Sequence, residues 1–246
     1  MAQVSMLLVL AGTAALPAFL VYLWFRLSRF RFSLPWFLCS LIGGIAAVFI
    51  ALIMGFLFEG FFAALGTALG GRLSLKGVFT AGNLPASIFR AALVEESSRL
   101  VVLFPLFAVF RRLKWGFGTT PGGSVDCCAA GLAGGLGFAL AETASYGAAN
   151  MGAALLRAFT AAPLHGACGG RAGLAAAAFR DNPAAGILRF LSAAAIHGMY
   201  NFLILRSGLS SVIAVLAASS FFVSSLVFIR RSPGWNGEKG GRLPDE

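Results

Sequence analysis

Hydrophobic and polar positions alternate along this chain in long blocks rather than residue by residue. Seven apolar blocks reach the ~20 residues that a helix needs to cross a bilayer. The pattern predicts an all-α protein, a polytopic transmembrane helix bundle of about seven spans within residues 1–231. The Gly-rich, polar residues 232–246 are expected to form a disordered cytoplasmic tail. The expected spans cover residues 5–25, 34–58, 86–110, 127–149, 152–179, 184–205 and 209–229.

The composition supports a membrane protein and excludes a soluble domain. Hydrophobic residues make up 59% of the chain and charged residues 11%, and the mean hydropathy is +0.86. The net charge of +10 does not predict a nucleic-acid partner, because the basic residues fall between the apolar blocks instead of forming one stripe. The lipid bilayer is therefore their expected partner.

The distribution of Lys and Arg predicts how the protein is oriented. Basic residues are more frequent after the first, third, fifth and seventh blocks than in the other connections. By the positive-inside rule, we expect a multi-pass protein of the cell membrane with its N-terminus outside and its C-terminus in the cytoplasm.

The four cysteines are expected to be small buried residues, because their spacing suits neither disulfides nor a zinc knuckle. They are Cys39, Cys127, Cys128 and Cys168.

The third block carries three ionisable side chains, Glu95, Glu96 and Arg99. A charge at the centre of a membrane helix costs roughly 2.5–3.5 kcal/mol, whereas each Leu, Ile, Phe or Val contributes only about 0.3–0.6 kcal/mol. On a helix, Arg99 can reach both carboxylates, because they precede it at i−4 and i−3. A purely structural ion pair would need only one acid. An ionisable side chain inside a membrane helix instead indicates a functional site.

A few polar side chains lie deep in the later blocks. They are Glu142, His165, and the pair His197 and Asn201, which share a helix face at i, i+4. From the 1.5 Å rise per helical residue, Glu95, Glu142 and the two histidines lie roughly 10–18 Å from the outer ends of their spans. Four helices thus bring acids and imidazoles to one layer, which predicts a shared site.

These residue types suit hydrolysis of an amide without a serine or cysteine nucleophile. A buried carboxylate can act as general base toward water. Adjacent carboxylates disfavour each other's ionisation, so one of Glu95 and Glu96 can stay protonated and act as an acid. A neutral imidazole and the Asn201 amide can donate hydrogen bonds to a developing oxyanion.

A bound metal is the alternative, because His and Glu are the usual ligands of open zinc sites. Glu142, His165 and His197 would then be the ligands. No His-Glu-x-x-His motif holds two ligands on one helix face, and Arg99 beside the acid pair would repel a cation. The expectation is therefore a glutamic-type site with no cofactor.

The motifs resemble those of the PrsW family of intramembrane proteases, which is related to the CAAX prenyl protease and bacteriocin-processing superfamily. The resemblance spans residues 93–201 and includes Glu-Glu-x-x-Arg, Gly-Phe-x-x-x-Glu, an isolated His and His-x-x-x-Asn, in that order. It implies an intramembrane endopeptidase that cleaves membrane-anchored proteins, with anti-sigma factors as the best-known substrates. The implied catalytic residues are Glu95, Glu96, Glu142, His165, His197 and Asn201, with Arg99 and Phe138 supporting them.

Two other classes of protein are consistent with buried acids and imidazoles. A proton- or metal-ion-coupled transporter uses such groups as a relay, but no internal repeat is evident here. A non-enzymatic membrane scaffold would leave this much buried charge unexplained.

Overall fold

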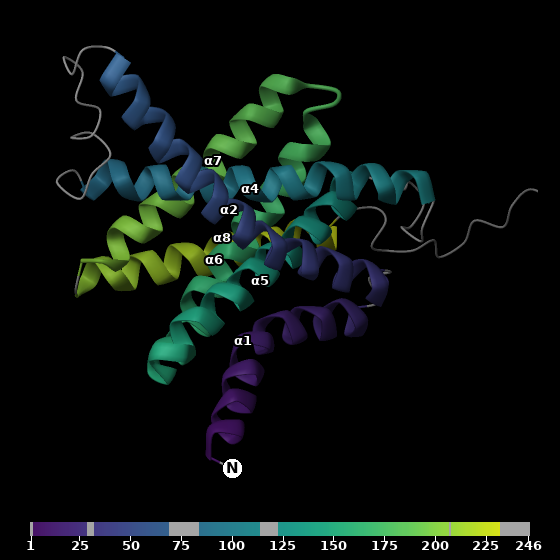
Figure 1. The fold of residues 1–246 in the computed structure, drawn as a ribbon. Helices are drawn as coiled ribbons and strands as arrows, with labels where there is room; N and C mark the ends of the chain where they lie inside the picture. Colours follow the sequence, from purple (N-terminus) through teal and green to yellow (C-terminus); the bar gives the residue numbers. More distant parts are fainter. Residues whose placement is uncertain (1, 29–31, 69–83, 114–122, 207, 232–246) are drawn as a thin grey trace, which may run out of the picture.

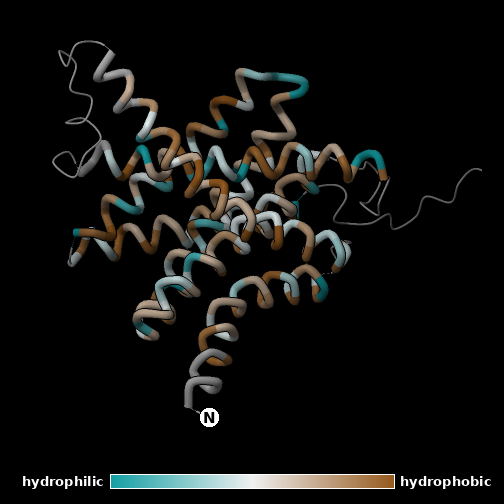
Figure 2. Tube along the Cα trace, in the orientation of Figure 1, coloured by the Kyte–Doolittle hydropathy of each residue, from teal (hydrophilic) through white to brown (hydrophobic). Residues whose placement is uncertain are grey.

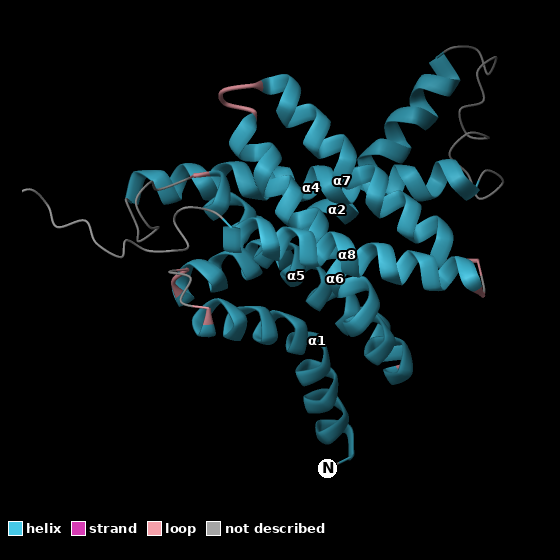
Figure 3. Cartoon of the chain, turned by 180° about the vertical axis from the view of Figure 1, so that it is seen from behind, coloured by secondary structure: helices cyan, strands magenta, loops and turns pink. Residues whose placement is uncertain are grey.

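The computed structural model describes residues 2–28, 32–68, 84–113, 123–206 and 208–231, and the expected tail at 232–246 lies outside them. The described residues form helices joined by short loops, with no strand (Figures 1 and 3). The all-α bundle predicted from the sequence is thereby confirmed. The helices are α1 (Ala2–Leu27), α2 (Leu34–Ala68), α4 (Leu84–Leu113), α5 (Ser124–Ala149), α6 (Met151–Ala178), α7 (Pro183–Ile204) and α8 (Leu209–Arg231).

Local chemistry explains several of the helix ends and one bend. The Asn150 side chain accepts hydrogen bonds from the first backbone N–H groups of α6, and Asn182 caps α7 in the same way. Pro183 then occupies the first turn of α7, where it removes no helical hydrogen bond. Within α1, Pro17 lies near the middle, where Figure 1 shows the helix bending.

Five of the described helices are long and apolar enough to cross a membrane by length and composition, namely α1, α2, α5, α7 and α8. Hydrophobic residues nevertheless run along all of the helices (Figure 2). The other two, α4 and α6, have 30 and 28 residues and are equally long enough. They carry most of the charged side chains that interrupt the apolar blocks, and several of these, Glu95, Glu96, Arg99 and Arg157, belong to the candidate site described below.

The centre of the bundle is the antiparallel pair α5 and α6. A Cβ atom at Gly131 would collide with the Gly169 backbone, and one at Gly135 with the His165 carbonyl. Small residues thus let the two backbones touch. This contact brings the His165 segment of α6 against the middle of α5.

One sequence expectation about the cysteines is wrong. Cys127, Cys128 and Cys168 are buried, but Cys39 is exposed. In a bilayer, lipid tails are as apolar as a protein core, so an apolar position need not face another helix. Cys39 lies on α2, most of whose side chains are not covered by the rest of the described protein.

Candidate functional site

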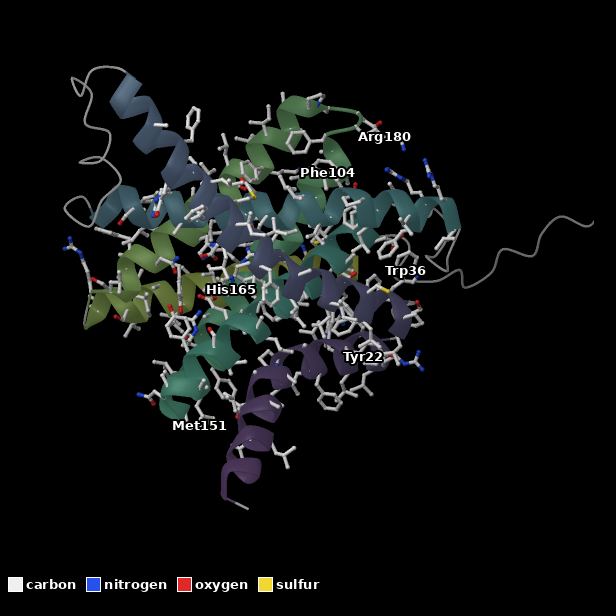
Figure 4. All side chains as sticks on the ribbon, in the orientation of Figure 1. Tyr22, Trp36, Phe104, Met151, His165 and Arg180 are labelled. Carbon is white, nitrogen blue, oxygen red and sulfur yellow. The ribbon has the colours of Figure 1, made fainter. Side chains whose placement is uncertain are left out.

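Arg99 on α4 is the hub of a buried cluster of polar side chains. One guanidinium nitrogen, Nη1, donates to the Glu96 carboxylate, and Nη2 donates to His165 Nδ1 at 2.6 Å. The side chain also lies over the Phe138 ring, 4.3 Å from its centroid. Glu96 and Arg99 are 0% and 2% exposed. The Glu96–Arg99 ion pair is thus buried inside the helix bundle. Figure 4 shows His165, the other partner of Arg99, near the middle of the bundle.

The cluster continues in both directions from Arg99. On one side, His197 Nδ1 donates to Glu96 Oε1 at 2.8 Å, and His197 Nε2 lies 3.5 Å from Glu95 Oε2. On the other side, His165 Nε2 lies 2.7 Å from Glu142 Oε2. Side chains from α4, α5, α6 and α7 therefore form one continuous line of contacts.

The line ends at a residue that the sequence did not point to. Arg157 Nη2 on α6 lies 2.7 Å from Glu142 Oε2, and its guanidinium stacks over the Tyr146 ring at 4.2 Å. A signal for this pair does exist in the sequence. Glu142 and Arg157 lie about equally far from Asn150, the turn between two antiparallel helices, so a simple hairpin register places them opposite each other.

Most of the expected site residues therefore meet in space, with one exception. Glu95, Glu96, Glu142, His165 and His197 lie in the line of contacts, and Phe138 packs against it. Asn201 lies one turn beyond His197 and is partly buried. In the part of the chain that the structure describes, no hydrogen bond or ion pair joins Asn201 to the others.

The three carboxylates have different partners. Glu96 pairs with Arg99 and Glu142 with Arg157. Among the described residues, no guanidinium lies within ion-pair distance of Glu95, whose Oε2 is buried without a hydrogen bond. Glu95 and Glu142 both line a cavity of about 720 Å³ between α2, α4 and α5, whereas Glu96 does not.

The partners also fix where the two imidazoles carry their protons. Arginine can only donate, so His165 Nδ1 is an acceptor and a neutral His165 carries its proton on Nε2, facing Glu142. Glu96 is ion-paired and accepts, so His197 carries its proton on Nδ1. A neutral His197 therefore presents the lone pair of Nε2 to Glu95.

This arrangement allows a test of whether a metal fits. Glu95, His165 and His197 each offer a donor atom within 4.8 Å of the others, and zinc takes donors of these types. However, both His165 nitrogens already face partners, and one of those partners is the Arg99 cation. Only Glu95 and His197 therefore offer a donor atom that is available to a metal. Open zinc sites use three protein ligands, one more than this set provides. As hydrogen-bonded here, the residues do not fit a catalytic zinc site. The set also differs from the one expected from sequence, because Glu95 takes the place of Glu142.

A bundle of membrane-length helices with acids and imidazoles buried beside a cavity defines a multi-pass membrane protein with a site inside its helical core. A family model described as "PrsW family intramembrane metalloprotease" matches residues 35–229. The chain therefore belongs to the PrsW family of intramembrane proteases, which confirms the resemblance seen in the motifs. The match runs from α2 to α8 and includes the whole cluster. No curated protein and no solved structure matches the chain.

Proposed function

We propose that this intramembrane protease cleaves peptide bonds of membrane-anchored proteins with a water molecule activated by Glu95. One observation carries the proposal. Of the three clustered carboxylates in the described residues, Glu95 alone lines the cavity without a guanidinium partner. It is therefore the acid most available to take up a proton. Anti-sigma factors are the proposed substrate class, because family resemblance implies them.

The proposed reaction adds one water molecule across the peptide bond. As the water oxygen bonds to the substrate carbonyl carbon, its proton passes to Glu95. Oε2 lies beside the free lone pair of His197 Nε2, so the two groups can share that proton. The carbon–nitrogen bond then breaks, and the proton passes from Glu95 to the leaving nitrogen. The products are a carboxylic acid and an amine.

The remaining residues position these two groups or contact the substrate. Glu96 orients His197 through the Nδ1 hydrogen bond, and Arg99 holds Glu96 in place. Glu142 lines the same cavity, and we assign it and His165 to the substrate side of the site. Asn201 remains a candidate oxyanion donor, on the same face of α7 as His197.

The experiment that tests the function compares membrane proteomes. Cells with the wild-type protein and cells with Glu95→Gln are analysed for new protein termini by mass spectrometry. Termini within or next to membrane segments that appear only with the wild type would support the proposal. Identical sets of termini, together with solute flux into liposomes containing the purified protein, would instead indicate a transporter.

A metal-dependent reaction is the second candidate, favoured by the close approach of Glu95, His165 and His197 and by the family description. We expect cleavage by the purified protein to survive exhaustive treatment with 1,10-phenanthroline or EDTA. Stoichiometric zinc by elemental analysis, with activity lost on chelation and restored by zinc, would overturn the glutamic mechanism. It would also require His165 to release Arg99, a change visible in the histidine NMR signals of protein with and without zinc.

We also propose a plasma-membrane orientation with the N-terminus outside and the C-terminus in the cytoplasm. The distribution of Lys and Arg supports it. Alkaline phosphatase fused to the C-terminus, which is active only outside the cytoplasm, should be inactive. An active fusion would reverse the orientation.

A further inference from the structure

The first half of α2 packs closely against α5. A Cβ atom at Gly44 would collide with the Gly134 carbonyl, and one at Gly137 with the Leu41 carbonyl, so α2 and α5 touch there. Further along α2, Cβ atoms at Gly55 and Gly60 would meet nothing within 4 Å. Figure 1 shows the second half of α2 diverging from α5. The diverging part of α2 forms one wall of the cavity that Glu95 and Glu142 also line.

One face of α2 forms the outer wall of that cavity. Its members recur at helical spacing, as in a stripe that packs against another helix. Phe56 is 76% exposed and Leu52 67% exposed, so the rest of the described protein leaves these large side chains uncovered. We call this set the α2 docking face: Val48, Phe49, Leu52, Gly55, Phe56 and Glu59.

We propose that the α2 docking face binds the transmembrane helix of the substrate and guides part of it to Glu95. This inference rests on the proposed function. The face is continuous with the candidate site, because the same cavity carries Glu95 on its opposite wall. Helix association within lipid depends on close packing at small residues, and Gly55 provides such a position between larger side chains.

The size of the cavity supports a helix that stays mostly in the lipid. A membrane-spanning helix about 10 Å wide and ~30 Å long occupies roughly 2,400 Å³. The cavity measures about 720 Å³, so it is too small to enclose such a helix completely. In this proposal, the rest of the segment lies along the exposed part of α2.

An ion pair marks one end of the docking face. Arg90 on α4 donates to Glu59 on α2 at 2.8 Å, and both side chains line the cavity. This contact links the two walls on the side where α2 ends and α4 begins. The apolar part of a bound substrate is therefore expected to end near Glu59.

Gly55→Leu tests the docking face, and Gly60→Leu is its matched control. Both changes put the same side chain into open space on α2, and both replace Gly with a better helix former. Only Gly55 lines the cavity. For a substrate identified in the proteome comparison, Gly55→Leu should lower kcat/KM about tenfold or more, equivalent to ~1.4 kcal/mol. Gly60→Leu should leave it unchanged. Unchanged kcat/KM in both variants, or an equal loss in both, would overturn the proposal.

Photocrosslinking separates failure of docking from failure of the proposed function. A photoreactive amino acid replaces Phe56 or, as a control, Leu216 on α8, which is 62% exposed. The host protein is Glu95→Gln, reconstituted with the same substrate. Crosslinks at position 56 and none at 216 would support docking on α2. Crosslinks to lipid only, or equal crosslinks at both positions, would overturn docking even if Glu95→Gln has abolished cleavage.

Discussion

Glu96→Gln and Glu95→Gln change neighbouring residues in the same way and should have different effects on stability. Glu96 is fully buried and pairs with Arg99, which is also buried. Its replacement leaves the Arg99 charge without a counter-ion, and breaking a buried pair in this way costs roughly 3–5 kcal/mol. The amide carbonyl of the substituted side chain can still accept from Arg99, so we expect a loss at the lower end, about 3 kcal/mol. Glu95 has no guanidinium partner among the described residues, so Glu95→Gln should cost little.

Thermal unfolding in detergent measures the difference. For domains of 150–250 residues, 1 kcal/mol shifts Tm by about 2–4 °C, so Glu96→Gln should lower Tm by roughly 6–12 °C. Glu95→Gln should melt with the wild type. Arg180→Ala, which removes an exposed pair with Asp181, controls for loss of a surface charge. Equal melting of the Glu95 and Glu96 variants would refute the assignment of Arg99 to Glu96.

Three further variants test other contacts. Arg157→Gln leaves Glu142 with His165 as its described partner. We expect kcat/KM in a cleavage assay to fall about tenfold, equivalent to ~1.4 kcal/mol. An unchanged kcat/KM would place Arg157 outside the site. Arg99→Lys should lower Tm, because one ammonium cannot match a guanidinium that reaches both Glu96 and His165; a wild-type Tm would mean that a point charge is enough. Gly135→Ala should cost about 1–3 kcal/mol in the same melts because its Cβ meets α6, whereas Gly12→Ala, in open space, should cost nothing.

Most of the fold was predictable from the sequence, because membrane helices are specified by long apolar blocks. The expected block at 152–179 corresponds to α6, Met151–Ala178, and the block at 184–205 to α7, Pro183–Ile204. The expected span at 34–58 is close to the membrane-length stretch Leu34–Phe61, and the helix α2 continues beyond it to Ala68. Its later turns are apolar but interrupted by Gly and Glu59, which lowers the hydropathy signal without breaking the helix.

The clustering of the candidate site residues was predictable from the sequence, but the contacts among them were less so. Acids and imidazoles are rare in apolar helices, so Glu95, Glu142, His165 and His197 could be identified one by one. The difference between Glu95 and Glu96 could not, because adjacent helical residues face different directions and packing decides which one faces the cavity. The buried pair of Glu96 with Arg99 is likewise a result of packing, and it is this pair that predicts destabilisation by Glu96→Gln.

The outer wall of the cavity had no signature at all. Phe56 and its neighbours on α2 look like any lipid-facing residues, and their place beside Glu95 comes from the divergence of α2 from α5. The two helices touch where glycines allow close contact, and they are apart further along α2. Spacing of polar residues along the chain carries no such information.

The most direct test of the central claim is the cleavage rate of purified Glu95→Gln in proteoliposomes that contain an identified substrate. General-base catalysis contributes about 10²–10⁴-fold to a rate, so cleavage should fall by at least ~100-fold while the Tm matches that of the wild type. Cleavage by Glu95→Gln at the wild-type rate would contradict the account.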